Sequence, residues 1–303
     1  MVDDAPHHPV LVEEVLNYVH WREGGIYIDA TLGAGGHAGA LLRSDPRARV
    51  LGFDVDAAAL DLARQRLKVY GDRFQAIHSN FTEMATYLKE QEMRCVDGIL
   101  ADLGMSSMQL DHAERGFSFL VEGPLDMRMD TRQALRAEDV VNHFSETVLA
   151  DLIYHYGEER CSRRIARAIV SHRPLSSTTQ LAEVVARSFR SSRRQRIHPA
   201  TRTFQALRIA VNEELNSLSR FLDEIPVLLS PGGRAVIISF HSLEDRPVKQ
   251  AFREWQKRGW VRILTPHVVT SSETEKRTNP RSRSARLRAA ERSSQALDTA
   301  VEK

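Results

Sequence analysis

Short apolar segments alternate with helical patterns from about Gly25 to Asp102, and this alternation constrains the fold more than any other feature of the chain. The segments are short and rich in β-branched or aromatic residues, which predicts strands at 26–28, 50–53, 74–77 and 99–101. Between two of them, Asp56 precedes apolar residues at helical spacing. Strands that alternate with helices are typical of βαβ units, so the sequence predicts an α/β fold with a doubly wound, Rossmann-like parallel sheet.

The alternation stops near Gln109 and resumes after Phe204. In between, apolar residues keep helical spacing, with helices expected at 162–170 and 180–189. A long amphipathic helix at 203–222, a turn at 231–233 and an apolar strand at 234–240 then restore the strand-helix order. Because a structureless loop of about 95 residues is improbable inside a compact domain, we predict an inserted helical domain.

The predicted organisation therefore has three parts. Residues 1–108 and 205–303 form the sheet-containing domain, and residues 109–204 form the insertion. From about 271 the chain is polar and rich in arginine and serine, so this tail is expected to be partly disordered until it binds a partner.

Composition excludes several classes of protein. The longest apolar stretches, such as 227–229 and 235–238, are far shorter than the roughly 18–20 residues of a membrane span, so no membrane partner is expected. The start of the chain lacks the basic and apolar regions of a secretory signal. Cys95 and Cys161 are too few for a disulfide framework, and a cytoplasmic protein is expected.

A glycine-rich loop, 29–39, follows the first predicted strand, and Asp54 ends the second. Glycines such as Gly35 and Gly36 let the backbone approach a ligand at the start of a helix, and an acid after the second strand can accept hydrogen bonds from ribose hydroxyls. The pattern indicates a nucleotide cofactor, with a purely structural turn as the less favoured alternative.

The charge near this loop favours one cofactor over another. Asp29 precedes the glycines of this loop and would repel a pyrophosphate, whereas it suits the sulfonium and ammonium groups of S-adenosylmethionine. A nicotinamide-dependent oxidoreductase is the alternative. Phe81, after the third strand, offers a ring for stacking on adenine or fills the core.

Asp102 ends the fourth predicted strand, and Gln109 follows it closely. The carboxyl ends of strands form the ligand crevice of an open α/β sheet, so substrate and cofactor are expected to meet here. A carboxylate on the N–H of an exocyclic amine would receive developing positive charge during its alkylation. The alternative is that Asp102 caps a turn or binds the cofactor only.

The histidines give weaker signals. His241, at the end of a predicted strand, either contacts the substrate or caps the following turn. His7, His8 and His198 are not spaced as metal ligands, and no metal site is assigned.

Two stretches, 187–202 and 276–292, concentrate arginine and contain almost no acid. Guanidinium groups match phosphate oxygens, so both stretches are candidate RNA contacts, with a solvated surface as the alternative. The candidate RNA-binding residues are Arg193, Arg194, Arg196, Arg202, Arg281 and Arg283.

Many longer strings, in order along almost the whole chain, resemble the ribosomal small-subunit RNA (cytosine-N4) methyltransferases, the MraW or RsmH family. The strings that carry the resemblance are 8–11, 27–31 with 35–37, 97–104 with 106–107 and 109–111, 114–119, 123–130, 156–160, 198–206, 239–246 and 279–281.

The resemblance implies a class I S-adenosylmethionine-dependent methyltransferase fold whose insertion recognises the substrate. The implied activity is methylation of the N4 amine of a cytidine in the decoding region of small-subunit (16S) ribosomal RNA, within the small ribosomal subunit, and a homodimer is left open. The implied cofactor residues are Gly35, Gly36, His37, Asp54, Phe81, Asp102 and Gln109.

One departure limits what the resemblance implies. DNA amino-methyltransferases usually carry an Asp/Asn/Ser-Pro-Pro-aromatic string after the fourth strand, whereas this chain has Asp102-Leu103-Gly104-Met105. The catalytic roles of Asp102 and His241 therefore remain hypotheses. A non-catalytic RNA-binding assembly factor on the same scaffold is a further alternative.

Overall fold

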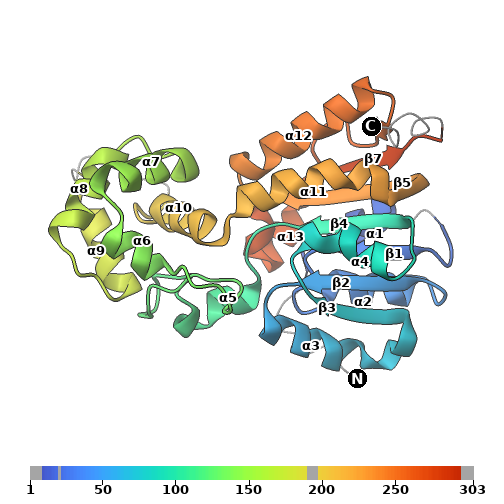
Figure 1. Cartoon of the computed structure of the whole chain (residues 1–303), viewed down its shortest axis with the longest axis horizontal. Helices are drawn as coiled ribbons and strands as arrows, with labels where there is room; N and C mark the ends of the chain where they lie inside the picture. The colour runs from blue at the N-terminus through green and yellow to red at the C-terminus, as the bar shows by residue number, and fades with distance from the viewer. Residues whose placement is uncertain (1–8, 20–21, 190–196, 295–303) are drawn as a thin grey trace. The chain divides into compact units, whose positions relative to one another are not determined.

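The computed structural model describes residues 9–19, 22–189 and 197–294, and the chain divides into two compact units (Figure 1). The sheet unit comprises Met1–Gly104 with Leu215–Lys303, and the helical unit comprises Met105–Glu214. Within the described residues, no helix is long and apolar enough to cross a membrane.

The sheet unit contains a seven-stranded sheet of order β3-β2-β1-β4-β5-β7-β6. Its strands are β1 (Ile26–Asp29), β2 (Arg49–Asp54), β3 (Phe74–His78), β4 (Val96–Asp102), β5 (Leu229–Ser239), β6 (Val261–Ile263) and β7 (Arg286–Arg292). The first five are parallel, and β7 runs antiparallel to β5 and β6. The chain order reverses between β1 and β4, which is where a doubly wound sheet opens a ligand crevice. The predicted parallel sheet is confirmed.

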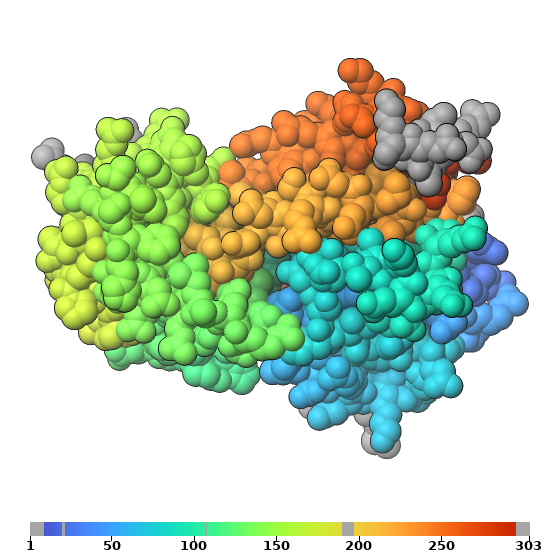
Figure 2. Space-filling view, viewed as in Figure 1, coloured from blue at the N-terminus to red at the C-terminus, as the bar shows by residue number. Residues whose placement is uncertain are grey.

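Helices cover both faces of this sheet. The α-helices assigned to this part of the chain are α1 (Val12–Val19), α2 (Gly36–Ser44), α3 (Ala57–Leu67), α4 (Met84–Glu90), α11 (Glu214–Leu228), α12 (Ser242–Lys257) and α13 (Glu273–Thr278). Shorter 3-10 turns are η1 (Lys68–Arg73), η2 (Phe81–Glu83) and η4 (Pro280–Ser284). In the space-filling view the atoms of α11 and α12, in orange, form a closely packed layer (Figure 2).

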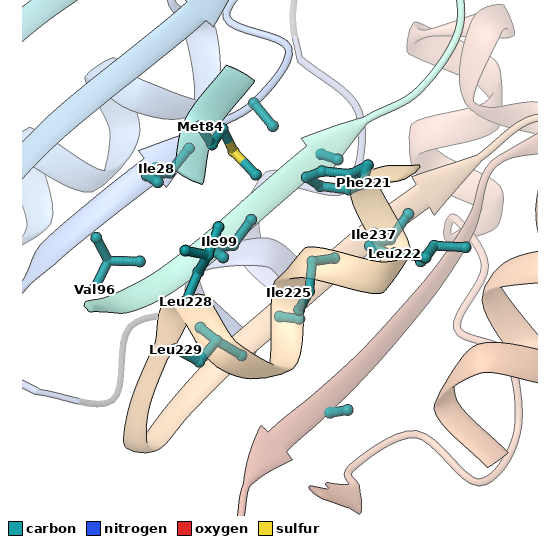
Figure 3. Close-up of a cluster of buried hydrophobic side chains, with 14 of the residues drawn as sticks. Ile28, Met84, Val96, Ile99, Phe221, Leu222, Ile225, Leu228, Leu229 and Ile237 are labelled. Atoms are coloured by element: carbon teal, nitrogen blue, oxygen red, sulfur yellow. The ribbon is translucent and has the colours of Figure 1, made fainter. Parts of the chain in front are cut away.

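Strand alternation explains the two cores of the sheet unit. In β4, Ile99 packs in the core beneath α4, α11 and α12, whereas its neighbour Leu100 packs in the core beneath α1, α2 and α3. Figure 3 shows the first of these cores, in which Phe221 and Ile225 of α11 lie over the strands.

The C-terminal segment differs from the prediction of partial disorder. Residues 273–292 form α13, η4 and β7, and β7 lies inside the sheet between β5 and β6. Leu287 and Ala289 are fully buried on one face of β7, whereas the guanidinium of Arg288 pairs with Asp245 of α12 at 2.7 Å. Although this segment is rich in charged residues, every second residue near the start of β7 is apolar, which is the period of a half-buried strand.

The expected helix at 203–222 is two helices. α10 (Thr201–Asn212) ends at Glu213, whose left-handed φ of 50° interrupts the helix, and α11 follows. The buried residues of α10 pack in the helical unit, and those of α11 pack in the sheet unit. The units therefore meet at 214/215 and 104/105, not at 204/205 and 108/109 as expected.

The expected turn at 231–233 lies within β5. Val96 of β4 faces Leu229, but Gly98 faces Arg234, so the Pro-Gly-Gly segment forms an irregularity in the β4–β5 register. Gly232 has a φ of 80°, which favours glycine at this position.

The helical unit contains short loops and helices around one apolar core. Its elements are α5 (Ser107–Asp111), η3 (Ala113–Arg115), α6 (Ala137–His143), α7 (Glu146–Gly157), α8 (Ser162–Ser171), α9 (Thr178–Arg187) and α10. The hydroxyls of Ser145 and Ser177 cap α7 and α9 by accepting backbone N–H bonds. α8 and α9 confirm the two helices expected in this region.

Candidate active site

The glycine-rich loop connects β1 to α2 in the sheet unit. Gly33 and Gly35 have φ values of 51° and 76°, and Gly35 directly precedes the first residue of α2. A Cβ at Gly36 would lie 2.9 Å from Cγ of Pro9. Larger residues would therefore strain the loop at Gly35 and crowd it at Gly36.

Asp54 fixes this loop from the end of β2. Its carboxylate accepts the Gly33 N–H at 2.7 Å and the Asp56 N–H at 2.9 Å. Burial raises the pKa of Asp54 to about 6, and the backbone N–H donors partly oppose that rise. A carboxylate has about four lone-pair sites, so these two bonds leave capacity for hydroxyl groups of a ligand.

Asp29, His37 and Asp102 form a cluster in the sheet unit, which we call the acidic cluster. Asp29 ends β1, Asp102 ends β4, and His37 lies in the first turn of α2. The His37 Nε2 atom lies 3.6 Å from Asp102 Oδ2. Asp29 and His37 are buried, whereas about a quarter of the Asp102 side chain is exposed.

The acidic cluster holds polar atoms with no hydrogen-bond partner in the part of the chain that the structure describes. They are Asp29 Oδ2, both ring nitrogens of His37, and Asp102 Oδ1. A buried polar atom without a partner costs roughly 1–3 kcal/mol, so four such atoms at one strand edge fit a site that is completed by a ligand.

The charges in the acidic cluster influence one another. Burial raises the pKa of Asp29 to about 6, although nearby His37 opposes this. Burial alone would lower the pKa of His37, but the carboxylates of Asp102 and Asp29 outweigh it and raise that pKa. When both acids are ionised they exceed the single imidazolium in charge, so the cluster favours a cationic ligand.

Backbone contacts hold the cluster in place. The Asp102 N–H donates to the Thr31 hydroxyl at 2.6 Å, and the Thr31 N–H donates to Asp29 Oδ1 at 3.3 Å. Thr31 therefore links the ends of β1 and β4.

A family model for the MraW methylase family matches residues 4–293, which is most of the chain. The chain belongs to the MraW methylase family. Proteins called ribosomal RNA small subunit methyltransferase H are similar throughout: one from a Cyanothece species is 51% identical over 286 residues, covering 94% of each chain. Another from Geobacter sulfurreducens is 50% identical over 306 residues, covering 94% of this chain and 98% of its own.

Among solved structures, an rRNA methylase from Streptococcus thermophilus is 11% identical, with a TM-score of 0.44, over 93% of each chain. The membership of the MraW methylase family and the seven-stranded sheet confirm the expected class I methyltransferase fold. S-adenosylmethionine is the cofactor of this methyltransferase family, as the sequence predicts. Its sulfonium and ammonium groups fit the charge of the acidic cluster.

The structure brings several expected site residues to the carboxyl edge of the parallel strands. His37 and Asp102 meet there, Asp54 contacts the glycine loop, and Phe81 begins η2 after β3. The half-buried Phe81 ring packs 4.9 Å from the ring of Phe221, so part of it fills the core, as one of the two interpretations held.

Gln109 lies in the helical unit. Its side-chain oxygen accepts the Ser106 N–H at 3.0 Å, and its own N–H donates to the Ser106 hydroxyl at 3.3 Å. This reciprocal pair is a capping box that begins α5, so Gln109 has a structural role there.

His241 occupies the N-cap position of α12, but its ring does not cap the helix. Its Nε2 atom lies 3.2 Å from Glu244 Oε1, and Glu244 Oε2 accepts the Phe240 N–H at 2.8 Å. His241 therefore has the cap position that one of the two interpretations held, through its carbonyl, which accepts the Asp245 N–H at 3.0 Å, and not through its ring. Glu244 was not among the predicted site residues, and a histidine at the N-cap gives no capping-box signal that would have indicated it.

The candidate RNA-binding arginines have different surroundings. Arg202, half-exposed on α10, lies 3.5 Å from a carboxylate oxygen of Glu159. Arg281 and Arg283 lie in η4, where Arg283 is exposed. Arg193, Arg194 and Arg196 lie outside the described residues.

Proposed function

We propose that this protein methylates the N4 amine of a cytidine in the decoding region of small-subunit ribosomal RNA. The proposal rests most on the acidic cluster at the carboxyl ends of β1 and β4, with its unsatisfied polar atoms. The names of the similar proteins support ribosomal RNA as the substrate. The protein would act in the cytoplasm, on RNA within the small subunit.

The sheet unit would bind and orient the methyl donor. Bound S-adenosylmethionine supplies an electrophilic methyl group on a sulfonium. Asp29 would attract the cationic end of the cofactor, and Asp54 would accept hydrogen bonds from its ribose while holding Gly33 in place. Gly35 and Gly36 would allow close backbone approach, Phe81 would present its ring to the adenine, and Gln109 is a further candidate contact.

Asp102 would act on the acceptor amine. The nitrogen lone pair of cytosine N4 is delocalised into the ring, and a carboxylate that accepts its N–H makes the nitrogen a better nucleophile. The bound cofactor would supply its methyl group to this nitrogen by direct displacement, with the sulfur as leaving group, and Asp102 or water would accept the proton that the amine loses. His37, whose Nε2 atom lies 3.6 Å from Asp102 Oδ2, would orient this carboxylate, and His241 is a candidate substrate contact.

The helical unit would recognise the RNA. Arg202 supports this role with an exposed guanidinium, and Arg193, Arg194 and Arg196 lie in the same basic stretch. Arg281 and Arg283 would add phosphate contacts from η4.

Nucleoside analysis tests the proposal. Purified protein and S-adenosylmethionine would be incubated with unmodified small-subunit RNA, naked and assembled, followed by digestion and mass spectrometry. The proposal predicts N4-methylcytidine with at least one of the two substrates. A different methylated nucleoside, or none while the cofactor binds, contradicts it. An NADH titration tests the oxidoreductase alternative, for which binding would be the supporting result.

A further inference from the structure

Three of the strings that carry the family resemblance meet at the start of α10, in the helical unit. The Gln205 side-chain amide donates to the Tyr156 carbonyl at 3.1 Å, and a Cβ at Gly157 would lie 2.6 Å from the Arg202 carbonyl oxygen. The ring of His198 lies 4.7 Å from the ring of Phe119. Strings 114–119, 156–160 and 198–206 thus build one local structure, with α7 packed against α10 (Figure 1).

A column of rings runs from the core of this unit to its surface. Phe204 of α10 is buried and contacts Phe119 edge-on, with 4.8 Å between ring centroids. Phe119 is half-buried, and the exposed imidazole of His198 lies over it at an interplanar angle of 34°. The outermost ring therefore lies on Phe119, which Phe204 supports from below, and keeps exposed ring surface.

A hydrogen bond from the backbone orients the His198 ring. The Ala200 N–H donates to His198 Nδ1 at 3.2 Å, which requires a lone pair on that nitrogen. In the tautomer that fits this bond, Nε2 carries the proton and is a hydrogen-bond donor. A flat ring with an edge donor suits stacking on a nucleobase.

A positive charge and exposed apolar side chains lie near His198 in the chain, and both suit a nucleotide as the ligand. Arg202 lies four residues after His198, and its half-exposed guanidinium has five N–H donors, of which Glu159 and the Glu158 carbonyl engage only part. Leu120 and Ile197, next to Phe119 and His198 in sequence, are 86% and 50% exposed.

We propose that His198, supported by Phe119, is a stacking platform for an unpaired base of the RNA substrate, and that Arg202 binds an adjacent phosphate. The inference rests on the proposed function and deepens it by naming a substrate-binding site. The occupant is an RNA and not an acidic protein segment, because a ring face beside a guanidinium matches a base and its phosphate, and the stretch 187–202 has six arginines and no acid.

The test compares His198→Ala with His198→Tyr in equilibrium binding to a small-subunit RNA transcript. Loss of one base-stacking contact is expected to weaken RNA binding roughly tenfold or more, and tyrosine is expected to restore most of it. His143→Ala is the matched control, because His143 is an exposed histidine of the same unit. S-adenosylmethionine affinity is expected to stay at the wild-type value in all three. Thermal unfolding is expected to stay unchanged in His143→Ala and to fall equally in the two His198 variants, which both lose the Ala200 hydrogen bond.

Salt dependence separates stacking from charge. His198→Ala is expected to leave the slope of log K against log salt unchanged, whereas Arg202→Gln is expected to reduce it by roughly 0.7, the value for one phosphate of a single strand. Wild-type affinity in His198→Ala overturns the inference. So does equal weakness in His198→Tyr, which would trace the loss to the Ala200 hydrogen bond.

Methylation by the wild-type protein is followed in parallel. RNA methylation with no effect of His198→Ala overturns the inference and leaves the proposed function standing. RNA binding that needs His198 but yields no N4-methylcytidine overturns the proposed function and leaves the platform standing. A wild-type protein that binds no RNA overturns both, and an acidic protein would then be the better occupant.

Discussion

The two units differ in how many of their buried side-chain polar atoms lack a hydrogen bond among the described residues. In the sheet unit, Asp29, His37 and Asp102 retain buried polar atoms without hydrogen bonds among the described residues. In the described part of the helical unit, Thr203 Oγ1 is the sole buried side-chain polar atom of that kind. Strand ends in a doubly wound sheet collect polar side chains that the fold itself does not need, and these are free to serve a ligand.

The helical unit uses its polar groups to hold its long connections. Asn212 of α10 donates to the Met127 carbonyl at 2.8 Å and accepts the Met129 N–H at 2.7 Å. Asn142 exchanges two hydrogen bonds with Leu175. The loops between helices lack a ladder of their own, so side chains must satisfy the backbone. We therefore expect substitutions of polar residues at the strand ends of the sheet unit to affect methyl transfer. Substitutions of many polar residues in the helical unit should affect stability instead.

Replacement of Asp102 should have the largest effect. Asp102→Ala is expected to lower the single-turnover rate of RNA methylation by roughly 100-fold or more, because the carboxylate that accepts the amine N–H is lost. S-adenosylmethionine affinity, measured by calorimetry, should fall much less. Asp61→Ala removes an exposed carboxylate of α3 in the same unit and should keep the wild-type rate. Near-normal turnover of Asp102→Ala would remove Asp102 from the mechanism.

The next largest effect is expected on stability, from a substitution in the C-terminal strand β7. This substitution tests whether the arginine-rich segment belongs to the sheet unit. Leu287 is fully buried in β7, and Leu287→Ala is expected to lower the free energy of unfolding by roughly 2–5 kcal/mol. Denaturant titration measures this. Leu120→Ala, at an exposed position, should change stability little. An unaffected Leu287→Ala protein would show that β7 does not contribute to the fold.

Replacement of Asp29 should raise the stability of the protein but weaken cofactor binding. Its pKa is about 6 in the folded protein against 3.8 normally, so the folded state binds more protons than the unfolded state between those values. Stability from this group is therefore lost as pH rises from about 4 to 6. At pH 8 Asp29→Asn should be more stable than wild type by roughly 3 kcal/mol, with little difference below pH 4.

The same variant should bind S-adenosylmethionine more weakly at pH 8, because the carboxylate that attracts its positive charge is gone. Thermal and denaturant unfolding across pH, with Asp61→Asn as the exposed control, measure the first effect, and calorimetry measures the second. Lower stability of Asp29→Asn at pH 8 would contradict the assignment of a buried, unsatisfied carboxylate.

A substitution in the helical unit should lower stability and leave S-adenosylmethionine affinity unchanged. Asn212→Ala leaves the Met129 N–H and the Met127 carbonyl without their partner, and stability should fall by roughly 1 kcal/mol or more. S-adenosylmethionine affinity should not change. Weaker cofactor binding with unchanged stability would break the distinction between the two units.

Local patterns predicted the five parallel strands of the sheet but neither β6 nor β7. The four strands before Asp102 have apolar runs and regular spacing, which sequence periodicity detects directly. In β7, charged residues separate the apolar ones. Arg288 pairs with Asp245 and Glu291 pairs with Arg234, which makes those charges compatible with the sheet. The break at Glu213 was also missed, because both flanking helices have helical spacing and only their separate cores distinguish them.

The candidate site was predictable in its residue types but not in its interactions. The glycine loop, Asp54 and Asp102 follow from their places after strands. The pairing of His37 with Asp102, the link through Thr31 and the contact of Glu244 with His241 depend on distances between segments far apart in sequence. The Ser-x-x-Gln spacing could have predicted the structural role of Gln109 in a capping box.

Hydrogen–deuterium exchange with and without S-adenosylmethionine tests most directly the claim that the sheet unit holds the methyl-donor site. Slower exchange is expected in the segments around 29–39, 54–56 and 102–104, because a ligand there would satisfy the acidic cluster and order the glycine loop. Exchange in the core helices α7 and α10 should not change. Protection confined to the helical unit, or none around the glycine loop at saturating cofactor, would contradict the account.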